Sequence, residues 1–209
     1  MLDKSLPYHP MVMRLDGEQV ARIGEPVLPN GFAFRFFRPG DELNWASVTT
    51  SVLEFDDENS ALEYFAKSFL PHPDLLQKRC LFIVDRGGEV VGTAMAWHIE
   101  SGRHHWACLH WVAVRPQFQR MGLGRAVVAK ALQRFAELDA GENVWLHTQT
   151  WSHRAVRLYH SMGFYLIRSE SLPSLSGGPV DKNEFGLAMA TLREVLPPAE
   201  WKDLMKTAR

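Results

Sequence analysis

The stretch from Leu109 to Ala126 decides the fold, and it reads Leu-His-Trp-Val-Ala-Val-Arg-Pro-Gln-Phe-Gln-Arg-Met-Gly-Leu-Gly-Arg-Ala. Its first six residues are rich in β-formers, and Pro116 ends the strand because proline cannot continue a hydrogen-bonded ladder. Apolar residues at helical spacing then predict a helix from about Gly122. A strand that leads through glycines into a helix N-terminus favours anion binding, because unpaired N–H groups and the helix dipole face the ligand.

The spacing of the glycines narrows the choice of anion. The loop has two glycines of the dinucleotide fingerprint, and no acidic residue follows at the distance of a ribose contact. It also lacks the Gly-Lys-Ser/Thr ending of nucleotide-hydrolase phosphate loops. Two interpretations remain: a distinct loop with the pattern Gln119-x-x-Gly122-x-Gly124, or an ordinary strand, turn and helix with incidental glycines.

A second motif lies downstream, between Trp145 and Phe164. Its core is Ala155-Val156-x-Leu158-Tyr159-x-x-x-Gly163-Phe164, on a helix for which Ser152 is the predicted N-cap. The two motifs, in this order and separation, resemble the Gcn5-related N-acetyltransferase (GNAT) family, which binds acetyl-coenzyme A. The motifs cover roughly residues 107–168, and the flanking elements extend the resemblance to about 32–190. The family often has Asn where Ser152 stands.

The resemblance implies a mixed α/β fold. In this fold a central, mostly antiparallel twisted sheet of about seven strands is flanked by helices, and a splayed pair of parallel strands holds the cofactor. The sequence pattern places strands at residues 32–37, 80–85, 89–99, 104–114, 143–150, 164–168 and 185–191. It places helices at residues 42–54, from a capping box at Ser60 to Leu70, from about 122 to 138, and 152–162.

The termini lie outside this pattern. Residues 1–30 are predicted to be an N-terminal extension with a hairpin, in which Asp16-Gly17 forms a type I′ turn. The resemblance implies that residues 31–192 form the acetyltransferase domain. Residues 193–209 form a helical tail, with Trp201, Leu204 and Met205 at helical spacing. That helix either packs on the chain's own body or forms a homodimer interface.

Family resemblance also implies the cofactor contacts. The coenzyme's pyrophosphate needs N–H donors from the loop, and the thioester oxygen needs a backbone N–H near Val112. The cofactor-binding residues implied are Val112, Ala113, Val114, Gln119, Arg120, Met121, Gly122, Leu123, Gly124, Arg125, Ser152, Ala155 and Tyr159. Acetyl-coenzyme A is the expected co-substrate, and no metal is expected.

Two residues are candidate catalysts. By resemblance, Tyr159 is the general acid that protonates the leaving thiolate, and the alternative is a buried structural tyrosine. His110 shares a strand face with Val112 and Val114, and it is the candidate base that deprotonates the acceptor amine. As a base it would give a step in the pH–rate profile near its ordinary pKa of about 6.5. The alternative is a packed or solvated strand histidine. No carboxylate lies between Gly102 and Gln119.

Other polar features have simpler explanations. Cys108 is expected to be a small buried residue rather than a nucleophile. His98, His104 and His105 cluster at a hairpin end, where surface histidines are the alternative to zinc ligands. The run Asp56-Asp57-Glu58 either attracts an acceptor's cation or is a solvated segment before a helix.

Composition bounds the class of protein. The 209 residues carry a formal net charge of −1, so no overall field favours nucleic acid or an anionic membrane. No apolar stretch approaches the about 20 residues of a membrane span, and the first residues lack a signal-peptide pattern. Two cysteines give neither a disulfide framework nor metal-ligand spacing, so a reducing, cytoplasmic location is expected.

The resemblance to the GNAT family implies an N-acetyltransferase that moves acetyl from acetyl-coenzyme A to a primary amine. A small amine or amino-acid-like acceptor is the first expectation, and a protein N-terminus or lysine is the second. The alternative of another class is a non-catalytic module that binds or senses acyl-coenzyme A. Tyr159 favours the enzyme, because a sensor needs no acid for a thiolate.

Overall fold

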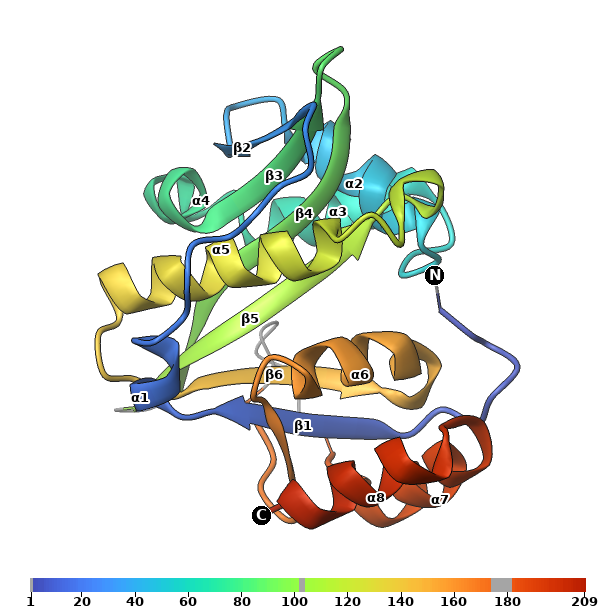
Figure 1. Ribbon diagram of the computed structural model, residues 1–209. Coiled ribbons are helices and arrows are strands. Elements are labelled where there is room, and N and C mark those ends of the chain that lie inside the picture. The colour runs from blue at the N-terminus through green and yellow to red at the C-terminus, as the bar shows by residue number, and fades with distance from the viewer. Residues whose placement is uncertain (1, 102–103, 174–181) are drawn as a thin grey trace.

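A computed structural model describes residues 2–101, 104–173 and 182–209 of the chain. Seven strands form one sheet in the order β2-β3-β4-β5-β6-β1-β7 (Figure 1). Neighbouring strands are antiparallel except β5 and β6, which are parallel. The strands are β1 (Pro10–Leu15), β2 (Phe32–Phe36), β3 (Cys80–Asp85), β4 (Val90–Ser101), β5 (His104–Val114), β6 (Val144–Gln149) and β7 (Tyr165–Ile167).

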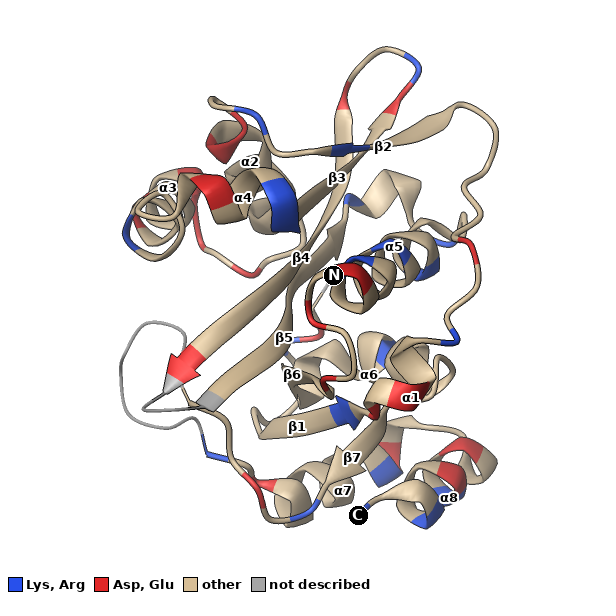
Figure 2. Ribbon diagram, turned by 90° about the vertical axis from the view of Figure 1, so that its left-hand side faces the viewer, with Lys and Arg blue, Asp and Glu red and all other residues tan. Residues whose placement is uncertain are grey.

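Helices flank the sheet on both faces. Among the described residues, no helix is both long and apolar enough to span a bilayer. Figure 2 shows that the charged residues lie mainly on helices and turns, whereas β4 and β5 carry almost none along their length. The helices are α1 (Gly17–Val20), α2 (Glu42–Ser51), α3 (Glu58–Ser68), α4 (Pro73–Arg79), η1 (Pro116–Phe118), α5 (Leu123–Leu138), η2 (Thr150–Ser152), α6 (His153–His160), α7 (Phe185–Val195) and α8 (Pro198–Thr207).

The predicted fold class is confirmed, but one predicted strand is wrong. Strands β2 to β7 lie where the alternation placed them. Residues 185–191, predicted as the last strand, belong to helix α7. Ala188, Met189 and Leu192 form its buried face. In a run with so many apolar residues, a helical pattern cannot be distinguished from a strand pattern. The seventh strand is β1.

The predicted N-terminal hairpin is also wrong. Strand β1 lies inside the sheet, between β6 and β7, and is followed by the short helix α1. Asp16 has an extended backbone (φ −70°), so there is no type I′ turn. Gly17 is needed for close approach instead, because a β-carbon there would lie 2.3 Å from the Gly141 carbonyl oxygen.

Two helix starts differ from expectation. Helix α3 begins at Glu58 rather than after Ser60, because the Asp57 carboxylate accepts a hydrogen bond from the Ser60 N–H (2.9 Å). Helix α4, which the sequence pattern did not predict, begins at Pro73, a first-turn position where the missing N–H of proline costs nothing.

Separate apolar clusters cover the two faces of the half-sheet β2–β5. Helix α5 packs on one face through residues such as Val127 and Phe135. Helices α2, α3 and α4 pack on the other, around the fully buried Trp45 and Phe65. Burying side chains of this size contributes about 1.5–3 kcal/mol each. The sheet is therefore fixed from both sides up to the point where β5 meets β6.

The predicted C-terminal helix is confirmed as α8, and it packs on the chain's own body. Leu204 is buried, and the Trp201 indole donates a hydrogen bond to the Met189 carbonyl (3.1 Å). Two polar contacts tie α8 to α6: the Arg157–Glu200 ion pair and a hydrogen bond between His160 and Asp203 (2.8 Å).

Candidate active site

The site begins where β5 and β6 part. These parallel strands pair only at Ala107–Val144 and Cys108–Trp145, whereas β5 continues to Val114 and β6 to Gln149. Beyond Cys108 the sheet is open between them. Backbone groups and side chains at this opening are therefore free to face a ligand.

A groove of about 270 Å³, here called the central groove, lies at this opening. It joins the end of β5 and its loop to the start of α6, with residues 52–54 and the N-terminal segment closing it. Its lining residues are Leu2, Val52, Glu54, Val112, Ala113, Val114, Gln119, Arg120, Gly124, Ser152, Arg154, Ala155 and Leu158. Eight of the predicted cofactor residues are thus brought together here.

A second hollow, here called the inner pocket, has a volume of about 410 Å³. It shares Glu54, Val112, Ser152 and Ala155 with the central groove, so the two meet. Its other lining residues are Tyr8, Pro10, Tyr64, Leu109, His110, Trp111, His147, Thr148, Gln149, Tyr159 and Lys182. Both predicted catalytic residues lie in this pocket.

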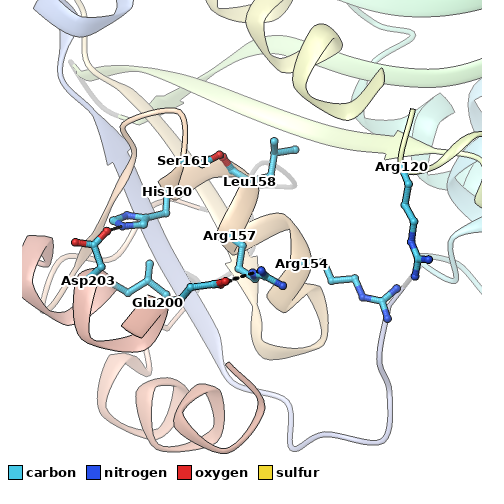
Figure 3. Close-up of a pocket in the computed structure, with 9 residues that line it drawn as sticks. Arg120, Arg154, Arg157, Leu158, His160, Ser161, Glu200 and Asp203 are labelled. Atoms are coloured by element: carbon cyan, nitrogen blue, oxygen red, sulfur yellow. Dashed lines mark hydrogen bonds and ion pairs between the residues drawn. The ribbon is translucent and has the colours of Figure 1, made fainter. Parts of the chain in front are cut away.

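A third hollow, the outer cavity, extends the groove toward α8 and has a volume of about 820 Å³. Figure 3 shows Arg120, from the loop, and Arg154, from α6, reaching toward the same space. Both residues and Leu158 also line the central groove. Neither arginine forms an ion pair with a residue in the described part of the chain, whereas Arg157 is held by Glu200 (Figure 3). The outer cavity therefore offers two uncommitted guanidinium groups.

The loop that begins the groove is shaped by left-handed residues. Arg120 (φ 64°) and Gly122 (φ 83°) both have positive φ, and α5 starts at the next residue, Leu123. The Gln119 side chain donates a hydrogen bond back to the Val114 carbonyl (2.8 Å), which closes the loop onto the strand end. The first N–H groups of α5 have no partner within the helix.

Four of the predicted cofactor residues line neither the central groove nor the inner pocket. Leu123 is buried in the core, and Met121 is exposed. Gly122 and Arg125 line a separate hollow beside residues 23–27, and Arg125 donates a hydrogen bond to the Ser161 hydroxyl (2.6 Å). For these four residues, the prediction of a cofactor contact is limited to their backbone atoms.

A β-bulge interrupts β5 next to the groove. Thr93 pairs with Ala113 and Met95 with His110, so Trp111 and Val112 together oppose the single residue between Thr93 and Met95. Trp111 has a left-handed backbone (φ 51°). Its ring is held 5.2 Å from Phe55 and 5.1 Å from Tyr64, between ring centroids. Such a bulge releases backbone groups from the ladder beside the opening.

Tyr159 lies at the floor of the inner pocket, on α6. Its ring packs against Phe164 with centroids 5.9 Å apart. Burial, and next the charge of Glu54, raise the pKa of Tyr159, so its hydroxyl keeps its proton at neutral pH. The position suits a proton donor that faces the junction of pocket and groove.

His110 projects into the inner pocket from β5. Its Nε2 atom is buried and has no hydrogen-bond partner among the described residues. Burial, with a smaller effect of His147, lowers the pKa of His110 to about 3. The imidazole is therefore neutral across the physiological range, and the pH–rate step expected from it moves from about 6.5 to about 3.

Ser152 occupies the predicted N-cap of α6, but its hydroxyl caps no helical N–H. Gln149 caps the preceding short helix η2, where its side-chain oxygen accepts a hydrogen bond from the Ser152 N–H (2.9 Å). The Ser152 hydroxyl therefore remains available to the groove and pocket that it lines.

Sequence analysis missed Glu54, which lines both the inner pocket and the central groove. The acidic run considered in its place lies outside both hollows: Asp56 is exposed and pairs with Lys4 (3.8 Å), and Asp57 caps α3. A signal for Glu54 was present, because it is the lone charge among the apolar residues 52–55.

The remaining candidates lie away from the opening. Cys108 is buried, which raises the pKa of its thiol, so it is the small buried residue that was expected. His98, Glu100 and His105 place ligand atoms within 4.8 Å of one another, and His105 hydrogen-bonds Glu100 (2.8 Å). The side chain of His104 lies outside the described residues.

Comparison with known proteins decides the family. Residues 43–164, more than half of the chain, match the model of the acetyltransferase (GNAT) family. The chain belongs to the GNAT family. The matched region contains the loop, the bulge and the helix of Tyr159.

Relatives of the GNAT chain include a mycothiol acetyltransferase from Streptomyces bingchenggensis, 30% identical over 68% of this chain and 46% of that protein. N-acetyltransferase family 8 member 3 from Rattus norvegicus is 32% identical over 57% of this chain and 49% of its own length. The chain spans about half the length of the curated relatives that it matches.

Solved structures share the GNAT fold. A GCN5-related N-acetyltransferase from Ralstonia eutropha superposes with a TM-score of 0.55 at 19% identity, over 69% of this chain and 99% of that chain. Another from Sphaerobacter thermophilus gives 0.56 at 22% identity, over 77% and 49% of the two chains.

Proposed function

We propose that this protein transfers the acetyl group of acetyl-coenzyme A to a small primary amine. The observation that carries the proposal is the continuity of three hollows along the opening between β5 and β6. The outer cavity shares Arg120 and Arg154 with the central groove, which in turn shares Glu54 and Ala155 with the inner pocket. An extended cofactor and a compact acceptor would meet where the groove joins the pocket. The acetyl transfer named in the relatives supports this chemistry.

Acetyl-coenzyme A would lie along the central groove and the outer cavity. The unpaired N–H groups at the start of α5 suit its pyrophosphate, since a helix N-terminus attracts anions. Arg120 and Arg154 suit its remaining phosphate, because a guanidinium binds phosphate with paired N–H donors. The thioester would then reach the bulge at Val112, whose released backbone groups suit the oxygen on which negative charge develops.

The acceptor would occupy the inner pocket. Its volume of about 410 Å³ falls in the range of small-molecule sites, and its aromatic side chains Tyr8, Tyr64 and Trp111 suit an apolar body. This size favours a small amine over a folded protein substrate. The neutral His110, whose Nε2 atom is buried, would accept a hydrogen bond from the acceptor's N–H and so orient the nitrogen.

Tyr159 would act as the general acid. The acceptor nitrogen attacks the thioester carbon, the C–S bond breaks, and the sulfur takes the Tyr159 proton. The tyrosinate recovers a proton from the nitrogen of the new amide. A hydroxyl held protonated by burial is suited to this step, because its proton leaves only when the thiolate forms.

The decisive test is thiol release from acetyl-coenzyme A over a panel of small amines, amino acids and peptides. Amine-dependent thiol release is the expected result, with small amines preferred to peptides. Thiol release with peptides but not with small amines would indicate that the acceptor is a protein. Tight binding of acetyl-coenzyme A without amine-dependent thiol release would indicate a non-catalytic binding module rather than an enzyme.

A further inference from the structure

The position of Glu54 suggests a role beyond lining the site. It lies on the turn after α2, and its N–H donates to the Thr49 carbonyl (3.2 Å). The preceding residue, Leu53, has a left-handed backbone (φ 71°), an uncommon conformation for a non-glycine residue. Glu54 is also the only acidic residue that lines either the inner pocket or the central groove among the described residues. The turn with the left-handed Leu53 thus places a single carboxylate where the inner pocket meets the central groove.

The Glu54 carboxylate is unpaired within the part of the chain that the structure describes. None of the described residues forms a hydrogen bond or an ion pair with it, and the residue is partly buried. A buried carboxylate without donors is costly unless a ligand satisfies it. Burial raises the pKa of Glu54, and Lys4 from the N-terminal segment opposes the rise. The carboxylate is therefore available to a cationic donor that enters the pocket.

Other titratable groups also line the two hollows. His110 and Tyr159 are shifted by burial toward their neutral forms. Arginine and lysine side chains are cations at neutral pH and take up no further proton. The remaining charged or titratable groups that line the two hollows are Tyr8, Tyr64, Arg120, His147, Arg154 and Lys182. Among the described residues that line the two hollows, Glu54 is the one carboxylate, so it can attract a cation by charge and then accept its proton.

We propose that Glu54 binds the acceptor's ammonium group and removes its proton before attack. This inference rests on the proposed function. The carboxylate takes one proton from R–NH₃⁺, which leaves a neutral amine with a free lone pair. The amine attacks the thioester carbon, Tyr159 protonates the departing sulfur, and the second nitrogen proton restores Tyr159. Glu54 then releases its proton to solvent, so that one proton leaves per acetyl group transferred.

The test compares Glu54→Gln with the wild type for two kinds of acceptor. Alkylamines are ammonium ions at neutral pH and need a base, whereas arylamines are neutral and do not. With alkylamines kcat/KM is expected to fall by about 10²–10⁴-fold, the usual scale of general base catalysis. With arylamines it should change only a few-fold. The alkylamine defect should shrink as the pH approaches the amine's own pKa.

Controls separate this role from folding and cofactor binding. Glu58→Gln, at the exposed start of α3, should behave as the wild type. Acetyl-coenzyme A affinity by calorimetry should be unchanged in Glu54→Gln, and circular dichroism should show a folded protein. Glu54→Asp keeps the charge with a shorter reach and should recover part of the alkylamine activity.

Three outcomes would overturn the inference. Equal losses with alkylamines and arylamines would mean that Glu54 only shapes the site. Wild-type alkylamine rates in Glu54→Gln would place the base elsewhere, with the proposed function intact. Absence of amine-dependent thiol release from the wild type would remove the proposed function and this inference together.

Discussion

Gly124, in the first turn of α5, and Leu158, on α6, lie next to each other in the lining of the central groove. A β-carbon built on Gly124 would lie 3.4 Å from Leu158 Cδ2, an ordinary contact with the end of a flexible side chain. The two sequence motifs therefore meet at this pair, one residue from each. Added bulk at Gly124 fills the groove without breaking the fold.

Gly124→Val is accordingly expected to weaken acetyl-coenzyme A binding at least tenfold, which corresponds to about 1.4 kcal/mol. Calorimetric titration measures the affinity, and circular dichroism checks the fold. Gly186→Val, on α7 where nothing lies near the added β-carbon, is the matched control. Wild-type affinity in a folded Gly124→Val protein would contradict the placement of the cofactor.

Tyr159→Phe tests the general acid. Phenylalanine keeps the packing against Phe164 and removes only the hydroxyl. We expect kcat to fall by about 10²–10⁴-fold with acetyl-coenzyme A affinity little changed. Steady-state kinetics with the best amine of the panel measures the change. An unaltered kcat would show that Tyr159 is structural or that a step other than chemistry limits turnover.

His110 predicts an acid dependence of stability. Its pKa is lowered from 6.5 to about 3 in the folded chain, so the unfolded chain binds one more proton between these pH values. Stability is therefore lost as the pH falls below about 6.5, by at most about 1.4 kcal/mol per pH unit until about pH 3.

Urea unfolding at pH 7.5, 6.5, 5.5 and 4.5 measures this dependence. His110→Gln should flatten it, whereas His72→Gln, at an exposed position before α4, should not. Equal pH dependence in the wild type and His110→Gln would mean that the imidazole is hydrated in the pocket.

Asp139→Asn tests a buried ion pair that holds α4 against the end of α5. Arg79 binds Asp139 through two hydrogen bonds (2.7 and 2.8 Å), and both side chains are less than a tenth exposed. Removing one partner leaves a buried charge, so we expect a loss of about 3–5 kcal/mol in the free energy of unfolding. Glu137→Gln, which breaks a more exposed pair with Arg134 nearby, should cost about 1 kcal/mol or less.

Gly17→Ala tests the close approach of α1 to residue 141. The added β-carbon would meet backbone atoms, which do not move aside as a side chain does, so the variant should lose about 1–3 kcal/mol of stability. Gly24→Ala, where nothing lies within 4 Å, should be neutral or slightly stabilising. Thermal unfolding of both variants measures the difference, and equal melting temperatures would contradict the clash.

Local patterns in the sequence determined most of the elements and both motifs. Alternation in residues 104–114 and helical spacing from Leu123 to Leu138 are properties of neighbouring residues, and the structure has β5 and α5 at those bounds. The glycines of the loop likewise predict a helix N-terminus that is open to an anion. Such features depend only on neighbouring residues, so they can be predicted from the sequence alone.

Only the tertiary structure decided which distant segments complete the site. Strand β1 lies between β6 and β7 because long-range pairing, not the local Asp16-Gly17 signal, sets its neighbours. Residues 185–191 are helical because their apolar face packs on the body. His110 has a low pKa because the fold buries its ring nitrogen. Glu54 lines the same pocket as Tyr159, after a left-handed residue at Leu53. Burial and long-range contact are properties of the folded chain, which is why no local pattern contains them.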